Sequence, residues 1–201
     1  MSQQEVDRER RKFLVAATAA MGTVGAAAVA WPFIASMLPS ARAKAAGAPV
    51  EVDISKIEPG AFVAVEWRGK PVWVVHRTKE MLDLLGKHED QLADPMSDMP
   101  QQPDYCKNKT RSIKEQYLVA VGICTHLGCS PTYRKEIGAA DLGADWHGGF
   151  FCPCHGSRFD LAARVFKGVP APTNMEIPPH KYLSDGLLLV GVDSKVESVG
   201  A

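Results

Sequence analysis

The sequence lacks an excess of charge of either sign. Its 201 residues include 23 Lys and Arg and 23 Asp and Glu, so the formal net charge is zero. A nucleic-acid-binding domain would normally carry a clear basic excess, and we therefore expect no nucleic-acid partner. The length suits one domain of about 150 residues with extensions. Because 46% of the residues are hydrophobic, a wholly disordered chain is excluded.

Cysteine is also scarce, with five residues in the whole chain. This number is too small for a domain built on disulfides. All but one of the cysteines gather in two short segments, 124–129 and 152–157, and this clustering indicates a site. The remaining one, Cys106, lies in a polar stretch, where we expect a free thiol whose role the sequence does not define.

Charged side chains are absent from residues 13–38. About 20 apolar residues are enough for a helix to cross a bilayer, so we expect a transmembrane anchor at 13–38. The basic residues within 1–12 favour a cytoplasmic N-terminus, which would place residues 50–201 in the periplasm. A cleaved signal peptide is the alternative, because Ala41-Arg42-Ala43 has the form of a cleavage site.

The residues just before this segment read Arg10-Arg11-Lys12-Phe13-Leu14. Paired arginines before a mild apolar stretch resemble a twin-arginine export signal, although Glu9 and Val15 depart from the usual pattern. That route exports folded proteins, which suits a protein whose cofactor is assembled in the cytoplasm. Residues 39–49 are small and show no apolar periodicity, and we expect a flexible hinge there.

Strand-like segments dominate residues 50–201. Strands are predicted at 61–67, 71–76, 117–121, 149–151 and 187–192. We expect a short helix at 78–87 and a long surface loop at 88–113, which is polar and punctuated by proline. Many short strands separated by Gly and Pro turns predict an all-β sandwich or a small barrel.

Two of these strands each run into a loop that contains both Cys and His. The first loop, 124–129, reads Cys-Thr-His-Leu-Gly-Cys, and the second, 152–157, reads Cys-Pro-Cys-His-Gly-Ser. Two Cys and two His can hold a tetrahedral zinc ion, which is the generic interpretation of such a set. One further Cys in each loop is then free to bond its counterpart, because disulfides persist in exported proteins.

The doubled pattern Cys-x-His-x-x-Cys and Cys-x-Cys-His-x-Ser resembles that of the Rieske iron–sulfur proteins. It is most similar to the iron–sulfur subunits of ubiquinol–cytochrome c reductase, the cytochrome bc complex. The resemblance spans nearly the whole chain and includes the Gly-Val-Pro-Ala-Pro segment at 168–172. It implies a Rieske-type antiparallel β-sandwich with a small cluster-binding subdomain, preceded by one N-terminal transmembrane helix.

The resemblance implies one [2Fe–2S] cluster of the Rieske type. Cys124 and Cys152 would be the thiolate ligands of one iron, and His126 and His155 the imidazole ligands of the other. Neutral imidazoles in place of two thiolates favour the reduced state, and Rieske centres as a class have potentials of about −150 to +300 mV. Reduction would also raise the pKa of a ligating imidazole, so that an electron and a proton are accepted together.

Other positions of the loops also take implied roles. Cys129 and Cys154 would form the disulfide that joins the loops. His155 would be the residue that hydrogen-bonds the quinol. Leu127 would cover the cluster and contact the quinone pocket, although simple packing is an equal alternative, and Gly128 would permit the tight loop.

Three further residues would tune or shield the cluster. Ser157 matches a serine whose hydroxyl bonds a bridging sulfide. Phe159 stands where many family members have a tyrosine that donates to a ligand sulfur, so we expect a lower potential here and a higher one in Phe159→Tyr. Pro170 would shield the far side of the cluster. The other histidines, by contrast, are expected on the surface or in packing: His76, His88, His147 and His180.

The function implied by the resemblance is that of a respiratory oxidoreductase subunit. It would oxidise ubiquinol by one-electron, proton-coupled transfer, pass the electron to a c-type cytochrome and contribute to proton translocation. Cytochrome b, a c-type cytochrome and lipid of the bacterial inner membrane would be partners in a dimeric complex. Alternatives are the small Rieske subunit of a periplasmic oxidase such as arsenite oxidase, a Rieske oxygenase, or a zinc-stabilised binding protein without redox chemistry.

Overall fold

The computed structural model describes residues 7–41, 43 and 47–193. The chain divides into two compact units, residues 1–45 and residues 46–201. Residues 42 and 44–46 of the predicted 39–49 hinge lie outside the described residues, as do residues 194–201 at the end of the predicted head.

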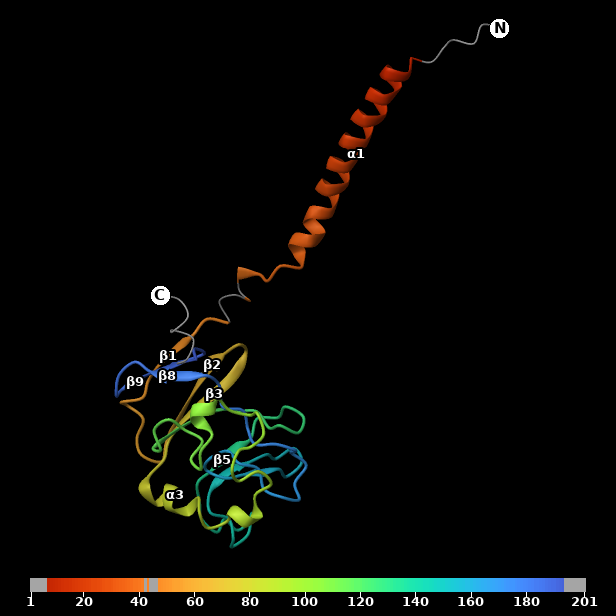
Figure 1. The fold of residues 1–201 in the computed structure, drawn as a ribbon. Helices are drawn as coiled ribbons and strands as arrows, with labels where there is room; N and C mark the ends of the chain where they lie inside the picture. The colour runs from red at the N-terminus through yellow and green to blue at the C-terminus, as the bar shows by residue number, and fades with distance from the viewer. Residues whose placement is uncertain (1–6, 42, 44–46, 194–201) are drawn as a thin grey trace. The chain divides into compact units, whose positions relative to one another are not determined.

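A single long helix, α1 (Arg8–Ser36), dominates the first unit (Figure 1). It begins at Asp7, whose carboxylate accepts hydrogen bonds from the backbone N–H groups of Glu9 and Arg10. None of its 29 residues is buried. At 1.5 Å per residue the helix is about 43 Å long, more than the roughly 30 Å of a hydrocarbon core. By length and composition it can cross a membrane.

The described part of the second unit consists of three antiparallel sheets of three strands each (Figure 1). The first sheet contains β1 (Val50–Asp53), β9 (Leu187–Val190) and β8 (His180–Tyr182), in that order. The second contains β2 (Phe62–Trp67), β3 (Lys70–His76) and β4 (Tyr117–Val121). The third contains β5 (Thr132–Arg134), β6 (Gly149–Phe151) and β7 (Arg158–Phe159). The predicted antiparallel β fold with one N-terminal apolar helix is confirmed.

Strand β3 is buried on both faces, which makes its sheet the middle layer of the head. Val72 and Val74 belong to the core that includes residues of β1 and β9. Trp73 and Val75 alternate with them and belong to the second core, where the Trp73 ring stacks on that of Phe150 in β6 at 5.4 Å between centroids. Because successive side chains of a strand point to opposite faces, β3 contributes to a hydrophobic core on each side of its sheet. The second core also contains both free thiols of the Cys–His loops.

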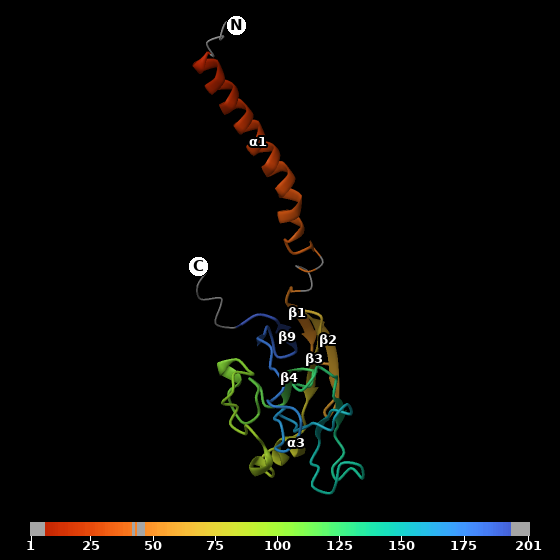
Figure 2. The ribbon, with the colours of Figure 1, turned by 90° about the vertical axis from the view of Figure 1, so that its right-hand side faces the viewer.

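The two long connections are irregular. Helix α3 (Lys79–Leu84) is short, and the connection after it contains only two brief 3-10 turns, η1 (Glu89–Gln91) and η2 (Asp104–Cys106), so the loop prediction holds for the described residues. In Figure 2 this green loop and the teal loop between β5 and β6 stand on opposite sides of the strands. One detail departs from the surface position predicted for this loop: Cys106 is fully buried, because η2 folds its thiol into the second core.

Candidate metal centre

The two Cys–His loops are closed by the same backbone hydrogen bond. The N–H of Cys124 donates to the carbonyl of Cys129, and the N–H of Cys152 donates to the carbonyl of Ser157, both at 2.8 Å. Each bond connects the first and sixth residues of its loop. The first loop lies between β4 and β5 and the second between β6 and β7, so antiparallel strands hold both in place.

A glycine completes each loop in the same way. The N–H of Gly128 donates to the carbonyl of Cys124 at 3.1 Å, and that of Gly156 donates to the carbonyl of Cys152 at 2.9 Å. Gly128 has φ of +85° and Gly156 has φ of +77°, a backbone region that side chains disfavour. The two loops are therefore geometrically equivalent, although their side chains differ.

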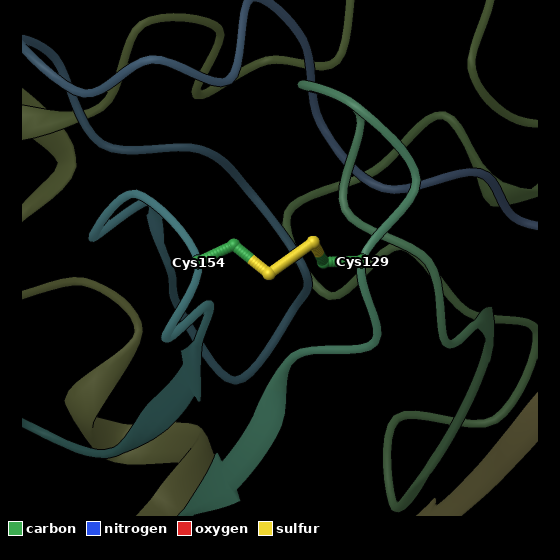
Figure 3. The surroundings of a disulfide bond; sticks show 2 residues. All are labelled: Cys129 and Cys154. Atoms are coloured by element: carbon green, nitrogen blue, oxygen red, sulfur yellow. A yellow bond between two sulfur atoms is a disulfide. The ribbon is translucent and has the colours of Figure 1, made fainter.

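A disulfide between Cys129 and Cys154 joins the loops, as Figure 3 shows. Their Cα atoms are 6.7 Å apart. This is the pair that the family resemblance implies. Among the described residues Cys106, Cys124 and Cys152 remain as free thiols, and only the last two belong to the loops.

The thiols of Cys124 and Cys152 are buried next to each other. Burial raises the pKa of the Cys124 thiol and is the largest cause; contact with Cys152 raises it further. The backbone N–H of His126 and the hydroxyl of Ser157 oppose this rise, because both donate hydrogen bonds to the sulfur. Two adjacent buried thiols with donors aimed at the sulfur are suited to a metal ion, which replaces the protons on binding.

The two imidazole rings lie outside this thiol pair. The ring centroids of His126 and His155 are 4.8 Å apart, and the rings meet edge to face. His126 is half-buried and His155 is exposed. Leu127, which follows His126, is 72% exposed and therefore contributes an apolar surface beside the rings.

The segment after β7 connects to both loops. The N–H of Ala171 donates to the Ser157 hydroxyl oxygen at 3.0 Å, and the Thr125 hydroxyl donates to the carbonyl of Thr173 at 2.7 Å. Pro170 lies next to Ala171 and is exposed. The segment therefore braces the two loops from one side.

The donor set of the site fits an iron–sulfur cluster with mixed ligands. Two soft thiols lie inside and two imidazoles lie outside, each pair drawn from both loops. Thiolates suit iron–sulfur clusters, and imidazoles suit iron as well as zinc. The sulfurs of Cys129 and Cys154 lie near that of Cys152, but the disulfide withdraws them from coordination.

Comparison with known families decides between these metals. Residues 49–181 match the family model described as "Rieske [2Fe-2S] domain", which covers more than half of the chain. This chain is a Rieske protein. Residues 1–40 match a second model, described as "Ubiquitinol-cytochrome C reductase Fe-S subunit TAT signal". The predicted cofactor, one [2Fe–2S] cluster, is thereby confirmed in preference to zinc.

Three relatives of this Rieske protein carry the same name, "Ubiquinol-cytochrome c reductase iron-sulfur subunit". The protein of Allochromatium vinosum is 68% identical over 193 residues, which cover 96% of this chain and 93% of the relative. That of Bradyrhizobium diazoefficiens is 45% identical over 90% of this chain and 94% of the relative. That of Rhodospirillum rubrum is 44% identical over 92% of this chain and 93% of the relative.

The remaining histidines of the Rieske protein lie in packing positions. His88 and His180 are buried, and the ring of His147 stacks on that of His88 at 5.5 Å between centroids. His76 bonds the carbonyl of Ile57 through Nδ1. The structure brings none of these four into the two loops.

Sequence reasoning did not find the buried charges near the site. Arg77, Arg111, Arg164 and Asp160 are buried in the folded head. Nothing in the local sequence of the three arginines distinguishes them from surface residues, because each donates to backbone carbonyls of distant segments. Asp160 in turn accepts hydrogen bonds from Arg164.

Proposed function

We propose that this Rieske protein accepts one electron from ubiquinol in a cytochrome bc complex and passes it to a c-type cytochrome. The names of the three relatives support this assignment, and none of them is a subunit of an oxidase such as arsenite oxidase. The observation that carries the proposal is the position of two imidazole rings at the outer side of two loops joined by a disulfide. An exposed leucine beside the rings offers the apolar contact that a quinol requires.

Four side chains would hold the cluster, Cys124 and Cys152 from the buried side and His126 and His155 from the outer side. When bound, the cluster supplies one-electron oxidation and reduction at a potential set by its ligands and their hydrogen bonds. Burial of the two thiols keeps water away from the sulfur side of the site.

His155 is the catalytic residue of this proposal. Its imidazole is exposed, so a ring nitrogen would accept a hydrogen bond from the quinol hydroxyl and then the proton of that hydroxyl. The electron that leaves the quinol with this proton would be taken up at the cluster. Leu127 packs against the apolar part of the quinol, and Gly128 keeps the loop tight behind it.

Three further residues belong to the surroundings of the cluster site. The Ser157 oxygen accepts the Ala171 N–H, so its own hydrogen stays available for a sulfur acceptor. Phe159 is fully buried in the same core but offers no donor. Pro170 stands in the segment that braces both loops and covers them from one side.

The predicted anchor, residues 13–38, would hold the protein in the bacterial inner membrane, in contact with lipid and with cytochrome b of a dimeric complex. Helix α1 contains residues 13–36 of it. The basic residues before the span favour a cytoplasmic N-terminus and a periplasmic head. Protease added to intact spheroplasts should remove the head and leave the membrane-embedded segment. Protection of the head until the membrane is opened would refute this orientation.

The ligand assignment is tested by EPR on membranes that contain the full-length protein. Ascorbate reduction should give a rhombic signal with average g below 2 in the wild type and in His147→Gln, the matched control outside the site. We expect His155→Gln to lose this signal and the ubiquinol–cytochrome c reductase activity. A normal signal in His155→Gln would overturn the ligand assignment, and a signal seen only with dithionite in the wild type would overturn the quinol-oxidising role.

A further inference from the structure

The buried charges of the head are unbalanced. Among the residues that the structure describes, the buried arginines are Arg77, Arg111 and Arg164, whereas Asp160 is the only buried carboxylate. Asp160 pairs with Arg164 at 2.7 Å. The described residues provide no carboxylate within ion-pair distance of the other two arginines, although the charge of Asp160 acts on both from farther away.

Arg77, just after β3, donates hydrogen bonds to two separate segments, residues 110–115 and Leu161. Nη1 bonds the carbonyls of Thr110 and Leu161 at 2.9 and 3.0 Å. Nε bonds the carbonyl of Glu115 at 3.0 Å, and Nη2 bonds the Ser112 hydroxyl at 2.9 Å. Neutral acceptors thus take up the donors of a fully buried guanidinium.

Arg111, in the loop between η2 and β4, makes a similar set of hydrogen bonds. Nη1 donates to the carbonyl of Ala163 at 3.0 Å, and Nη2 donates to the carbonyl of Met175 at 2.9 Å and to the side-chain oxygen of Gln102 at 2.8 Å. Together the two arginines tie residues 161–163, the turn that follows β7, to the rest of the head. That turn comes directly after the second Cys–His loop and its strand.

Arg111 reaches the core that contains the two thiols, whereas the Leu161 carbonyl that Arg77 binds belongs to a smaller hydrophobic core. Ala163 and Met175, whose carbonyls Arg111 binds, are members of the core that also contains Cys124 and Cys152. A buried ion without a counter-ion costs several kcal/mol, and nearby positive charge favours a reduced iron–sulfur cluster because reduction adds an electron.

We propose that Arg77 and Arg111 are positioning residues with an electrostatic role: they fix the turn behind the second loop, and their positive charges, which Asp160 alone does not balance, raise the reduction potential of the cluster. This inference rests on the ligand set of the proposed function. Burial lowers the pKa of both side chains to about 10, so both are charged at neutral pH. Substitution by lysine separates the effect of the charge from that of the hydrogen bonds. Lysine keeps the positive charge but cannot make the several hydrogen bonds of a planar guanidinium.

The test compares Arg77→Lys and Arg77→Met in the full-length protein within its complex, with Arg111→Lys and Arg111→Met as a second series. The midpoint potential is measured by EPR-monitored redox titration, and the melting temperature is measured on the same preparations. We expect all four variants to melt earlier than the wild type, and only the Met variants to have a lower potential. Lys167→Met is the control, because it removes one exposed positive charge near Gly156 and should shift the potential less.

Several results would overturn the proposal. One is a Met variant that keeps the cluster at the wild-type midpoint potential. Another is an equal lowering of the midpoint potential by the Lys and Met variants. A third is a shift of the midpoint potential in Lys167→Met as large as that in the Met variants of the arginines. If the Met variants lose the cluster while the Lys variants keep it at the wild-type potential, the requirement for charge is supported. If the Lys variants also lose the cluster, the role is structural only. A normal wild-type EPR signal in the same experiment leaves the proposed function standing in each case.

Discussion

Replacement of Asp160 by asparagine removes the only buried carboxylate in the described part of the chain and nearly preserves its shape. Oδ2 of Asp160 accepts a hydrogen bond from Nε of Arg164 at 2.7 Å. Oδ1 accepts hydrogen bonds from the backbone N–H groups of Ala162 and Arg164 at 2.9 and 2.8 Å. An asparagine amide can satisfy part of this set, but it cannot neutralise the guanidinium.

The structure sets the size of the effect. In Asp160→Asn the Arg164 side chain would stay buried with only carbonyl partners, those of Leu85 and Pro95, and with Glu89 as its nearest carboxylate at 4.0 Å. Removal of one partner from a buried ion pair costs about 3–5 kcal/mol. For a domain of this size, that loss corresponds to a melting temperature lower by about 6–20 °C.

The control is an ion pair of the same chemistry at the surface. Arg134 and Asp141 form two hydrogen bonds of 2.8 Å, but their side chains are 26% and 60% exposed. Because exposed pairs contribute about 0–1 kcal/mol, Asp141→Asn should leave the melting temperature nearly unchanged. Circular dichroism of both full-length variants measures the difference. Equal, small losses in Asp160→Asn and Asp141→Asn would refute the reasoning.

The pH dependence of the same variant gives a second check. Burial alone raises the pKa of Asp160, but the neighbouring His88 imidazole, whose Nε2 lies 3.5 Å from Oδ2, and the charge and hydrogen bonds of Arg164 outweigh it. The pKa therefore lies below its usual 3.8. A carboxylate with a lowered pKa contributes stability above its unfolded pKa and loses it as the pH falls through the folded value. The stability gap between wild type and Asp160→Asn should therefore narrow below about pH 4. A constant gap down to pH 2 would contradict this assignment.

Three further changes test the site. Serine at both Cys129 and Cys154 opens a loop with a sequence separation of 25, which should lower the free energy of unfolding by about 3.5 kcal/mol; an unchanged melting temperature would contradict this. Phe159→Tyr adds a donor within the core of the site and should raise the midpoint potential in a redox titration, whereas an unchanged potential would refute the role given to this position. Gly149 has φ of +148°, and in Gly149→Ala the new Cβ would clash with the Phe159 carbonyl. This variant should lose the cluster, measured as iron content. Gly86→Ala is the control and should keep its iron, because the space around the new Cβ is open.

The sequence predicted those parts of the fold whose signals are local. The β2–β3 hairpin follows from alternating residues on both sides of Arg68-Gly69, and both turn residues have positive φ. Strands β1, β5, β7 and β8 were missed, because each has two to four residues and depends on pairing with another strand. The equally short β6 was predicted at 149–151, where two phenylalanines run directly into Cys152.

The buried polar groups were missed for a related reason. Arg77 follows the last residue of β3 and Arg111 lies in a polar loop, so local sequence favours exposed positions for both. Their burial depends on the carbonyls of the 161–163 turn, which come from a segment far along the chain. Cys106 is buried in the same way, through the fold of its loop rather than through any pattern around it.

Equivalent loops with different side chains explain how the site separates its two tasks. In each loop the first residue is a cysteine whose N–H and carbonyl are both bonded within the loop, so its thiol is fixed and buried. The histidine is the third residue in the first loop and the fourth in the second, and His126 is half-buried whereas His155 is exposed. Because both loops have the same two backbone hydrogen bonds, this shift of one position accounts for the more exposed imidazole of the second loop. Proton exchange with a quinol is therefore expected at His155, while the buried thiols hold the iron away from water.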